Sequence, residues 1–146
     1  MDDEKFMRLA IDEAKKAYSD GEKNGIGSII VKDDEVISFD HNNVKLNNDS
    51  TAHAEINAIR NASNKLKTHR LEECVLYITC EPCPMCFAAA WWSRISKIVF
   101  GIYISDVVEK GNRQINMSCE ELNKKGTYQI DIEGGFLKEE CLKFFK

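Results

Sequence analysis

The sequence predicts a layered α/β fold, because strands and helices alternate along much of the chain. Two apolar runs rich in β-branched residues, 74–80 (CVLYITC) and 97–103 (KIVFGIY), are typical of buried strands. The segment 83–94 between them follows Pro82 and is predicted to be a helix. A strand, a helix and a second strand in this order indicate that part of the sheet is parallel.

The N-terminal part is predicted as one amphipathic helix followed by a β-hairpin. Apolar residues recur at helical spacing over residues 5–18. Turn dipeptides within 20–25 end this helix. Two short apolar runs, 28–31 (SIIV) and 35–39 (EVISF), flank the polar turn 32–34 and form the predicted hairpin.

A further helix is predicted to begin at Ser50 or Thr51, either of which can cap it, and to run to about Ser63. The residues before it, 42–50, are predicted to be a polar loop. The remaining segments are predicted as a partly helical stretch, a late strand and a final helix: 105–126, 127–132 and 136–145.

Length and composition describe a globular protein with its own core. The 146 residues are 43% hydrophobic and 30% charged, which predicts one domain spanning 1–146. The acidic, amphipathic N-terminal segment does not resemble a signal peptide. No apolar run reaches the roughly 18 residues of a membrane span. We therefore expect a cytoplasmic protein that has no membrane partner.

The charge balance argues against a nucleic-acid partner. Lys and Arg number 20 and Asp and Glu number 24, a net charge of −4. Proteins that grip phosphates usually carry a basic stripe. The nearest feature is a small cluster that is interpreted as a solvated loop: Lys65, Lys67, His69 and Arg70.

Six cysteines and no secretion signal favour reduced thiols over disulfides. Cys83 and Cys86 are three apart at a predicted helix start, so both sulfur atoms share one face and can reach one metal ion. The helix N-terminus favours the thiolate, which is the form that binds zinc. A redox pair, or two buried thiols packed as small hydrophobic groups, are the alternatives.

His53 makes the metal interpretation stronger. With Cys83 and Cys86 it supplies three ligands, and three protein ligands with an open position are typical of catalytic zinc. Cys80 could close the site as a fourth ligand, although a cysteine at a strand end is expected to point into the core. Glu55 is a candidate proton shuttle beside the metal. The alternative for Glu55 is a solvated helix carboxylate, since residues two apart on a helix do not share a face.

The chain resembles the zinc-dependent cytidine and deoxycytidylate deaminase superfamily. The segments HAE (53–55) and PCPMC (82–86) match the H-x-E…P-C-x-x-C signature of zinc nucleobase deaminases. The likeness is greatest to bacterial guanine deaminases and tRNA adenosine deaminases, through TAHAEINAIR, LYITCEPCPMC and SRISKIVFG. The resemblance implies a three-layer α/β/α sandwich around a five-stranded mixed sheet, usually in a dimer or larger oligomer.

The resemblance also implies a role for each motif residue. His53, Cys83 and Cys86 correspond to the ligands of one zinc ion per chain, and Glu55 to the proton shuttle. Asn42 stands where the family places an asparagine that hydrogen-bonds the base. Without the resemblance, Asn42 would be interpreted as a loop residue that bonds its own backbone. The backbone N–H groups near Ala54 and Cys83 are expected to contact the ring.

The apolar helix at 87–92 is expected to be buried on both sides. One side would face the core and the other a partner subunit in a homodimer. The alternative is a helix that lies wholly inside one chain.

The expected substrate is a small free nucleobase. Guanine deaminases are similar in the motif CEPCPMC and in a tryptophan at the place of Trp92, which would line the pocket. Their aspartate that holds the guanine amino group corresponds to Gln114 here, and an amide cannot supply that charge. Guanine, cytosine or an aminotriazine is therefore expected. The alternatives are adenosine-to-inosine deamination of tRNA and a non-catalytic zinc-stabilised module.

Overall fold

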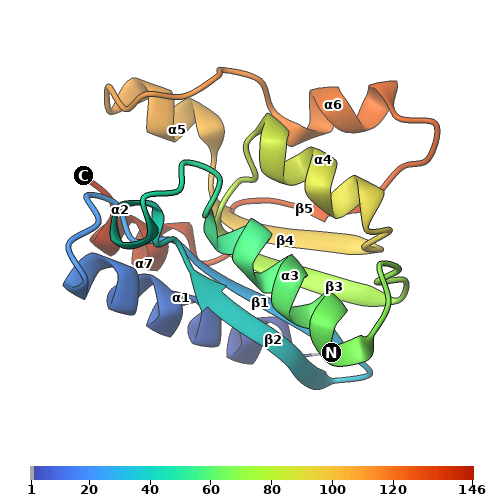
Figure 1. The fold of residues 1–146 in the computed structure, drawn as a ribbon. Coiled ribbons are helices and arrows are strands. Elements are labelled where there is room, and N and C mark those ends of the chain that lie inside the picture. Colours follow the sequence, from blue (N-terminus) through green and yellow to red (C-terminus); the bar gives the residue numbers. More distant parts are fainter. Residues whose placement is uncertain (1) are drawn as a thin grey trace.

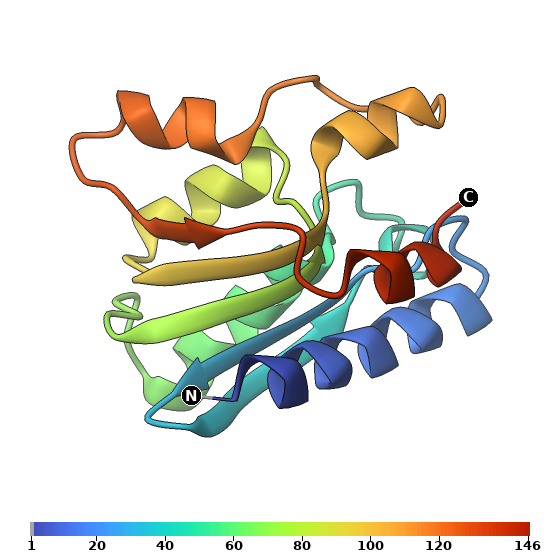
Figure 2. The same ribbon diagram turned by 180° about the vertical axis from the view of Figure 1, so that it is seen from behind.

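The computed structural model describes residues 2–146, in which a five-stranded sheet lies between two layers of helices (Figures 1 and 2). The strand order is β2-β1-β3-β4-β5. The strands are β1 (Gly27–Lys32), β2 (Glu35–His41), β3 (Cys74–Cys80), β4 (Lys97–Ile102) and β5 (Asp131–Glu133).

The sheet is mixed, as expected. Strand β1 runs antiparallel to both β2 and β3, whereas β3, β4 and β5 run parallel to one another. The hairpin between β1 and β2 turns at Asp33 and Asp34, which both have positive φ angles. The parallel pair β3 and β4 is joined by helix α4 (Pro84–Trp92), as the order strand, helix, strand predicts.

The helical layers lie on opposite faces of the sheet. Helix α1 (Asp3–Ser19) and the short α7 (Lys138–Cys141) cover one face, while α3 (Ala54–Leu66) and α4 cover the other (Figures 1 and 2). Four shorter elements complete the fold: α2 (Val44–Asn47), α5 (Ile104–Glu109), α6 (Cys119–Lys125) and the 3₁₀ helix η1 (Leu142–Phe144). None of the helices within residues 2–146 has the length and apolarity needed to span a membrane.

Two cores form because successive strand residues point to opposite faces. All of β3 is buried. Its Leu76 and Ile78 pack in the core under α3 and α4. Its Val75 and Tyr77 pack in the core under α1 and α7. An apolar strand that is covered on both faces explains why 74–80 is a continuous hydrophobic run.

Helix α3 begins later than predicted. Its N-cap is His53, not Ser50 or Thr51. Thr51 lies in the turn before the helix, where its N–H and its hydroxyl both donate to Asp49 Oδ1, at 2.9 Å and 2.7 Å. The polar stretch before it was predicted to be a loop but also contains the short helix α2.

The C-terminal elements are shorter than predicted. Strand β5 covers only Asp131–Glu133, because the amide of Asn123 already binds both the N–H and the carbonyl of Ile130, each at 2.8 Å. The final helix begins only at Lys138, since Leu137 before it adopts a left-handed φ of 51°. The ambiguous region 105–126 contains α5 and α6 with an irregular segment between them.

Candidate active site

Three side chains with metal-binding atoms meet where α3 and α4 begin. His53 is the N-cap of α3 and Cys83 the N-cap of α4, while Cys86 lies in the first turn of α4. His53 Nδ1 is 3.7 Å from Cys83 Sγ and 3.4 Å from Cys86 Sγ. Tetrahedral zinc with ordinary Zn–N and Zn–S bonds separates such ligand atoms by about 3.6 Å. The donor set and its spacing therefore fit zinc.

The two cysteines differ in electrostatic environment. A hydrogen bond from the Cys86 thiol, aided by another from His53, lowers the pKa of Cys83 to about 4, although partial burial opposes this. The hydrogen bond to Cys83 and deep burial raise the pKa of Cys86. A metal ion bound between them would favour the thiolate form of both.

Glu55 lies beside this cluster although it is two residues from His53. Its side chain is buried, with 4% of the residue exposed. Burial and the neighbouring charge of Cys83 raise the pKa of Glu55 to about 7, while a hydrogen bond with Cys86 acts in the opposite direction. A cation bound at the cluster would lower this pKa and favour the carboxylate. Residues two apart within a helix point to different faces, but His53 lies before α3 and has an extended backbone. Glu55 can therefore face the same cluster as His53.

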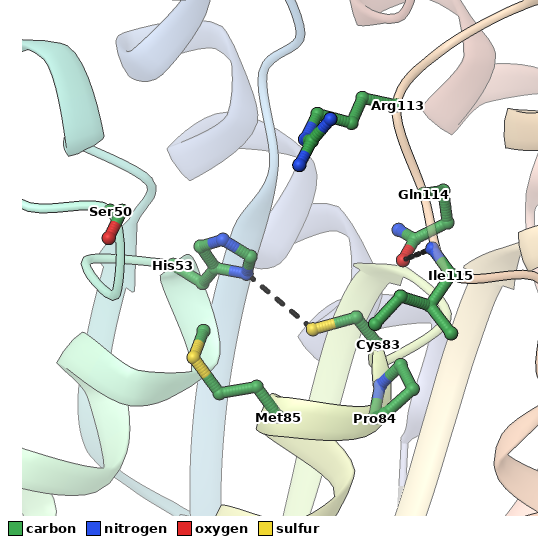
Figure 3. A pocket seen from close by; sticks show the side chains of 8 residues that line it. All are labelled: Ser50, His53, Cys83, Pro84, Met85, Arg113, Gln114 and Ile115. Atoms are coloured by element: carbon green, nitrogen blue, oxygen red, sulfur yellow. Dashed lines mark hydrogen bonds between the residues drawn. The ribbon is translucent and has the colours of Figure 1, made fainter.

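A pocket of about 570 Å³ opens over His53 and Cys83 (Figure 3). This volume is in the range of small-molecule sites. One side is formed by residues before and at the start of α3, and the other by the segment between α5 and α6. The lining residues are Ser50, His53, Cys83, Pro84, Met85, Arg113, Gln114 and Ile115.

Gln114 lines the pocket together with its neighbours Arg113 and Ile115, which no sequence motif predicts. The side-chain oxygen of Gln114 accepts a hydrogen bond from the Ile115 N–H at 2.9 Å. Figure 3 shows the Arg113 side chain extending over the pocket on the side away from Pro84. The sequence carried no signal for Arg113 and Ile115, because their segment has no hydrophobic period and no recognisable motif.

Asn42 is engaged by the backbone near β1 and does not line the pocket. Its Oδ1 accepts from the Ile26 N–H and its Nδ2 donates to the Asn24 carbonyl, both at 2.9 Å. A side-chain amide has a second acceptor lone pair and a second N–H. Contact of Asn42 with a base therefore stays a prediction.

Two other predicted residues lie in different positions. Ala54 is buried and is the first residue of α3, so its N–H belongs to the helix start, which lacks intrahelical partners. Trp92 is not a lining residue of the pocket: it is 74% exposed and packs edge-on against Trp91. It ends α4, roughly 9 Å along the axis from Cys86 and roughly 13 Å from Cys83.

Cys80 is not part of the cluster. It is buried in the core under α1, so no fourth protein ligand comes from the strand end. The alternative of a helix wholly inside one chain is wrong for α4, because Met85 and Trp92 on its outer face are exposed. Burial of that face by a partner subunit stays a prediction.

The sequence matches one family model over most of its length. The model describes the cytidine and deoxycytidylate deaminase zinc-binding region and matches residues 1–102. A guanine deaminase of Bacillus subtilis (strain 168) is 40% identical over 111 residues, covering 76% of this chain and 71% of the relative. A tRNA-specific adenosine deaminase of the same organism is 40% identical over 139 residues, covering 95% of this chain and 83% of the relative.

Solved structures include members of the same two groups of relatives. A chain from a study of A-to-I editing by tRNA:A34 deaminases at the wobble position of transfer RNA has a TM-score of 0.84 at 33% identity, covering 97% of this chain and 99% of that one. Guanine deaminase of Bacillus subtilis has a TM-score of 0.73 at 38% identity, covering 78% and 73%.

Proposed function

The chain belongs to the cytidine and deoxycytidylate deaminase family, and from this premise we propose that it hydrolyses the amino group of a free nucleobase and releases ammonia. That the chain is a hydrolytic deaminase whose cofactor is zinc follows from the family. The role of each site residue and the choice of substrate are the proposal. One observation carries it: a three-ligand cluster beside a buried carboxylate at the floor of a small-molecule pocket.

His53, Cys83 and Cys86 would hold zinc, and their three donor atoms leave one tetrahedral position open. A bound zinc would supply Lewis acidity that activates water. Glu55 would accept a proton from the attacking water at a carboxylate oxygen and deliver it to the amino nitrogen, which leaves as ammonia. The ring carbon gains a carbonyl oxygen in exchange, and the second proton of the water ends on the adjacent ring nitrogen. The Ala54 N–H and Asn42 would orient the base.

The charges around the pocket support a neutral free base. Arg113 is the one Lys or Arg among the lining residues. The basic cluster predicted from the sequence lies at the other end of α3, which is about 20 Å long. Arg70 of that cluster is paired with Glu72 at 2.7 Å. A polyanionic substrate would therefore find few partners near the site.

The wall of the pocket bears on which base is selected. Gln114 offers an amide where the guanine deaminases are expected to have a carboxylate, so we propose that strict guanine specificity is relaxed. Cytosine and aminotriazines stay candidate substrates. The non-catalytic alternative is set aside because the chain belongs to a family of enzymes.

Deamination of adenosine in tRNA is the second candidate. The observation in its favour is the extent of the sequence likeness, since the tRNA-specific adenosine deaminase of Bacillus subtilis is 40% identical over 139 residues and the guanine deaminase of the same organism over 111 residues. The two candidates share the reaction and differ in what surrounds the base.

We also propose a homodimer in the cytoplasm. The outer face of α4 exposes Met85, Ala88 and Trp92, which lie along one helical stripe. An apolar stripe of this kind is stabilised when a second subunit covers it. All six cysteines are free, which suits a reducing compartment.

An ammonia-release screen with zinc-loaded protein tests the proposed function. Free bases, nucleosides and a tRNA anticodon hairpin are compared, with Glu55→Gln as the control for contaminating activity. Turnover of a free base supports the first candidate. Turnover of the hairpin alone contradicts it and supports the second.

A further inference from the structure

The carboxylate of Glu81 joins the metal-ligand turn to the wall of the pocket. Glu81 follows β3 and precedes Cys83 by two residues. It is buried, with 4% of the residue exposed. The Ile104 N–H donates to its Oε1 at 2.8 Å, and the Cys119 N–H donates to its Oε2 at 2.7 Å. Both oxygens of one carboxylate are therefore used inside the protein.

The two donors are the first residues of α5 and α6. An N–H at the first position of a helix has no partner within that helix, so a buried one must find an acceptor elsewhere. The irregular segment 110–118 lies between the two helices and carries Arg113, Gln114 and Ile115. Glu81 thus binds at both ends of the part of the chain that forms this wall of the pocket.

The middle of the segment is attached differently. The Asn112 side chain accepts from Asn24 Nδ2 at 3.0 Å and donates to the Lys146 carbonyl at 3.1 Å. These contacts lead to the loop after α1 and to the C-terminus. The contacts of Glu81 instead lead to the turn that holds Cys83, with Pro82 between them. Glu81 therefore connects the segment that forms the wall to the turn that holds the metal ligands, whereas Asn112 connects it to other parts of the chain.

We propose that Glu81 is a positioning residue that sets the placement of Arg113, Gln114 and Ile115 relative to the metal ligands. It acts on substrate selection without touching substrate. The inference rests on the proposed function in one respect, namely that this wall contacts the base. Loss of either hydrogen bond would let one end of the wall move while the zinc ligands stay in place.

Glu81→Gln tests this directly. The new amide NH₂ places a donor against an N–H donor, so one buried N–H loses its acceptor. We expect unchanged zinc content, hydrogen exchange about tenfold faster in amides of 104–119, and a KM raised about tenfold with a smaller change in kcat. Glu120→Gln, which removes an exposed carboxylate from the first turn of α6, is the matched control and should leave all three unchanged.

Cys119→Pro keeps the test decisive if Glu81→Gln does not fold. Proline is favoured at the first helical position and lacks the N–H, so it deletes one hydrogen bond to Glu81 and retains the helix start. Ser118 before it has an extended backbone that proline tolerates. Cys119→Ala, which loses the thiol and keeps the N–H, is the matched control. Both variants lose the thiol, which also hydrogen-bonds Glu81, so the difference between them reports the N–H contact alone. The proline variant should show faster exchange and a higher KM than the alanine variant.

Three results would overturn the inference: unchanged exchange over 104–119, faster exchange spread equally over β3 and α3, or a fall in kcat with KM unchanged. The exchange measurement needs no turnover. If the wild-type protein deaminates no base and the exchange change is still confined to 104–119, the proposed substrate class fails while the structural role of Glu81 stands.

Discussion

His53 Nδ1 lies 3.4 Å from Cys86 Sγ, although 33 positions separate the two residues in the chain. The contact exists because α3 and α4 pack on the same face of the sheet and begin beside each other (Figure 1). Each helix start presents N–H groups that favour anionic ligands. The meeting of two helix starts thus produces a site for a cation held by thiolates.

Cys86→Ser should lose zinc and deaminase activity together, because a hydroxyl does not replace a thiolate as a zinc ligand. Metal analysis should give one zinc per chain for the wild type and much less for the variant. Cys141→Ser, at a buried cysteine outside the cluster, should keep its zinc. Full zinc in Cys86→Ser would refute the ligand assignment.

Glu55→Gln should keep zinc and fold but lose turnover by a factor of about 10² to 10⁴, which is the range of general acid–base contributions. The amide cannot accept the proton of the attacking water. Zinc content and steady-state rates are measured on the same preparation. A rate within a few-fold of wild type would show that another group transfers the proton. Glu109→Gln, at an exposed carboxylate, is the control.

Asn42→Ala should lower kcat/KM on the best substrate by a factor equivalent to about 1–3 kcal/mol, since an edge of the bound base is left unpaired. The substitution also removes two hydrogen bonds to backbone groups near β1. Thermal unfolding is therefore measured alongside the kinetics. A lower Tm with unchanged kcat/KM would assign Asn42 to the loop alone, and Asn43→Ala then tests the neighbouring amide.

Gln114→Asp should shift preference toward guanine. The carboxylate supplies a charged acceptor for the guanine amino group, which the amide lacks. The ratio of kcat/KM for guanine to that for cytosine is the measurement, and it should rise. Gln129→Asp, at an exposed glutamine outside the pocket, should leave the ratio unchanged. An unchanged ratio in Gln114→Asp would separate Gln114 from base selection.

The KM for deamination of a free base should vary little between low and physiological salt, because a neutral substrate makes no phosphate contacts. Each phosphate contact of a nucleic-acid substrate would contribute a slope of about −0.7 to −0.9 in log K against log salt. KM for the best free base and for the anticodon hairpin is measured over the same salt series. Efficient, steeply salt-dependent turnover of the hairpin would favour the tRNA candidate.

Local sequence accounts for the elements that have a continuous or periodic hydrophobic pattern. The strand 74–80 was predicted with its correct bounds, because burial on both faces leaves an uninterrupted apolar run. The start of α3 and the length of β5 could not be predicted in this way. Both lie beside contacts in which a polar side chain binds backbone groups, Asp49 that of Thr51 and Asn123 that of Ile130, and such side chains have several possible partners.

The sequence by itself determined the chemistry of the site. The residue types and spacing of HAE and PCPMC indicate zinc, a proton shuttle and a deaminase family, because ligand identity is set by side-chain chemistry that a short motif contains. Only the tertiary structure decided what surrounds that chemistry. It placed Trp92 outside the lining of the described pocket, buried Glu55 beside the ligands, and added Arg113 and Ile115 to the wall. These positions follow from the packing of segments that are distant in the chain, joined in part through Glu81, and no local pattern records such packing.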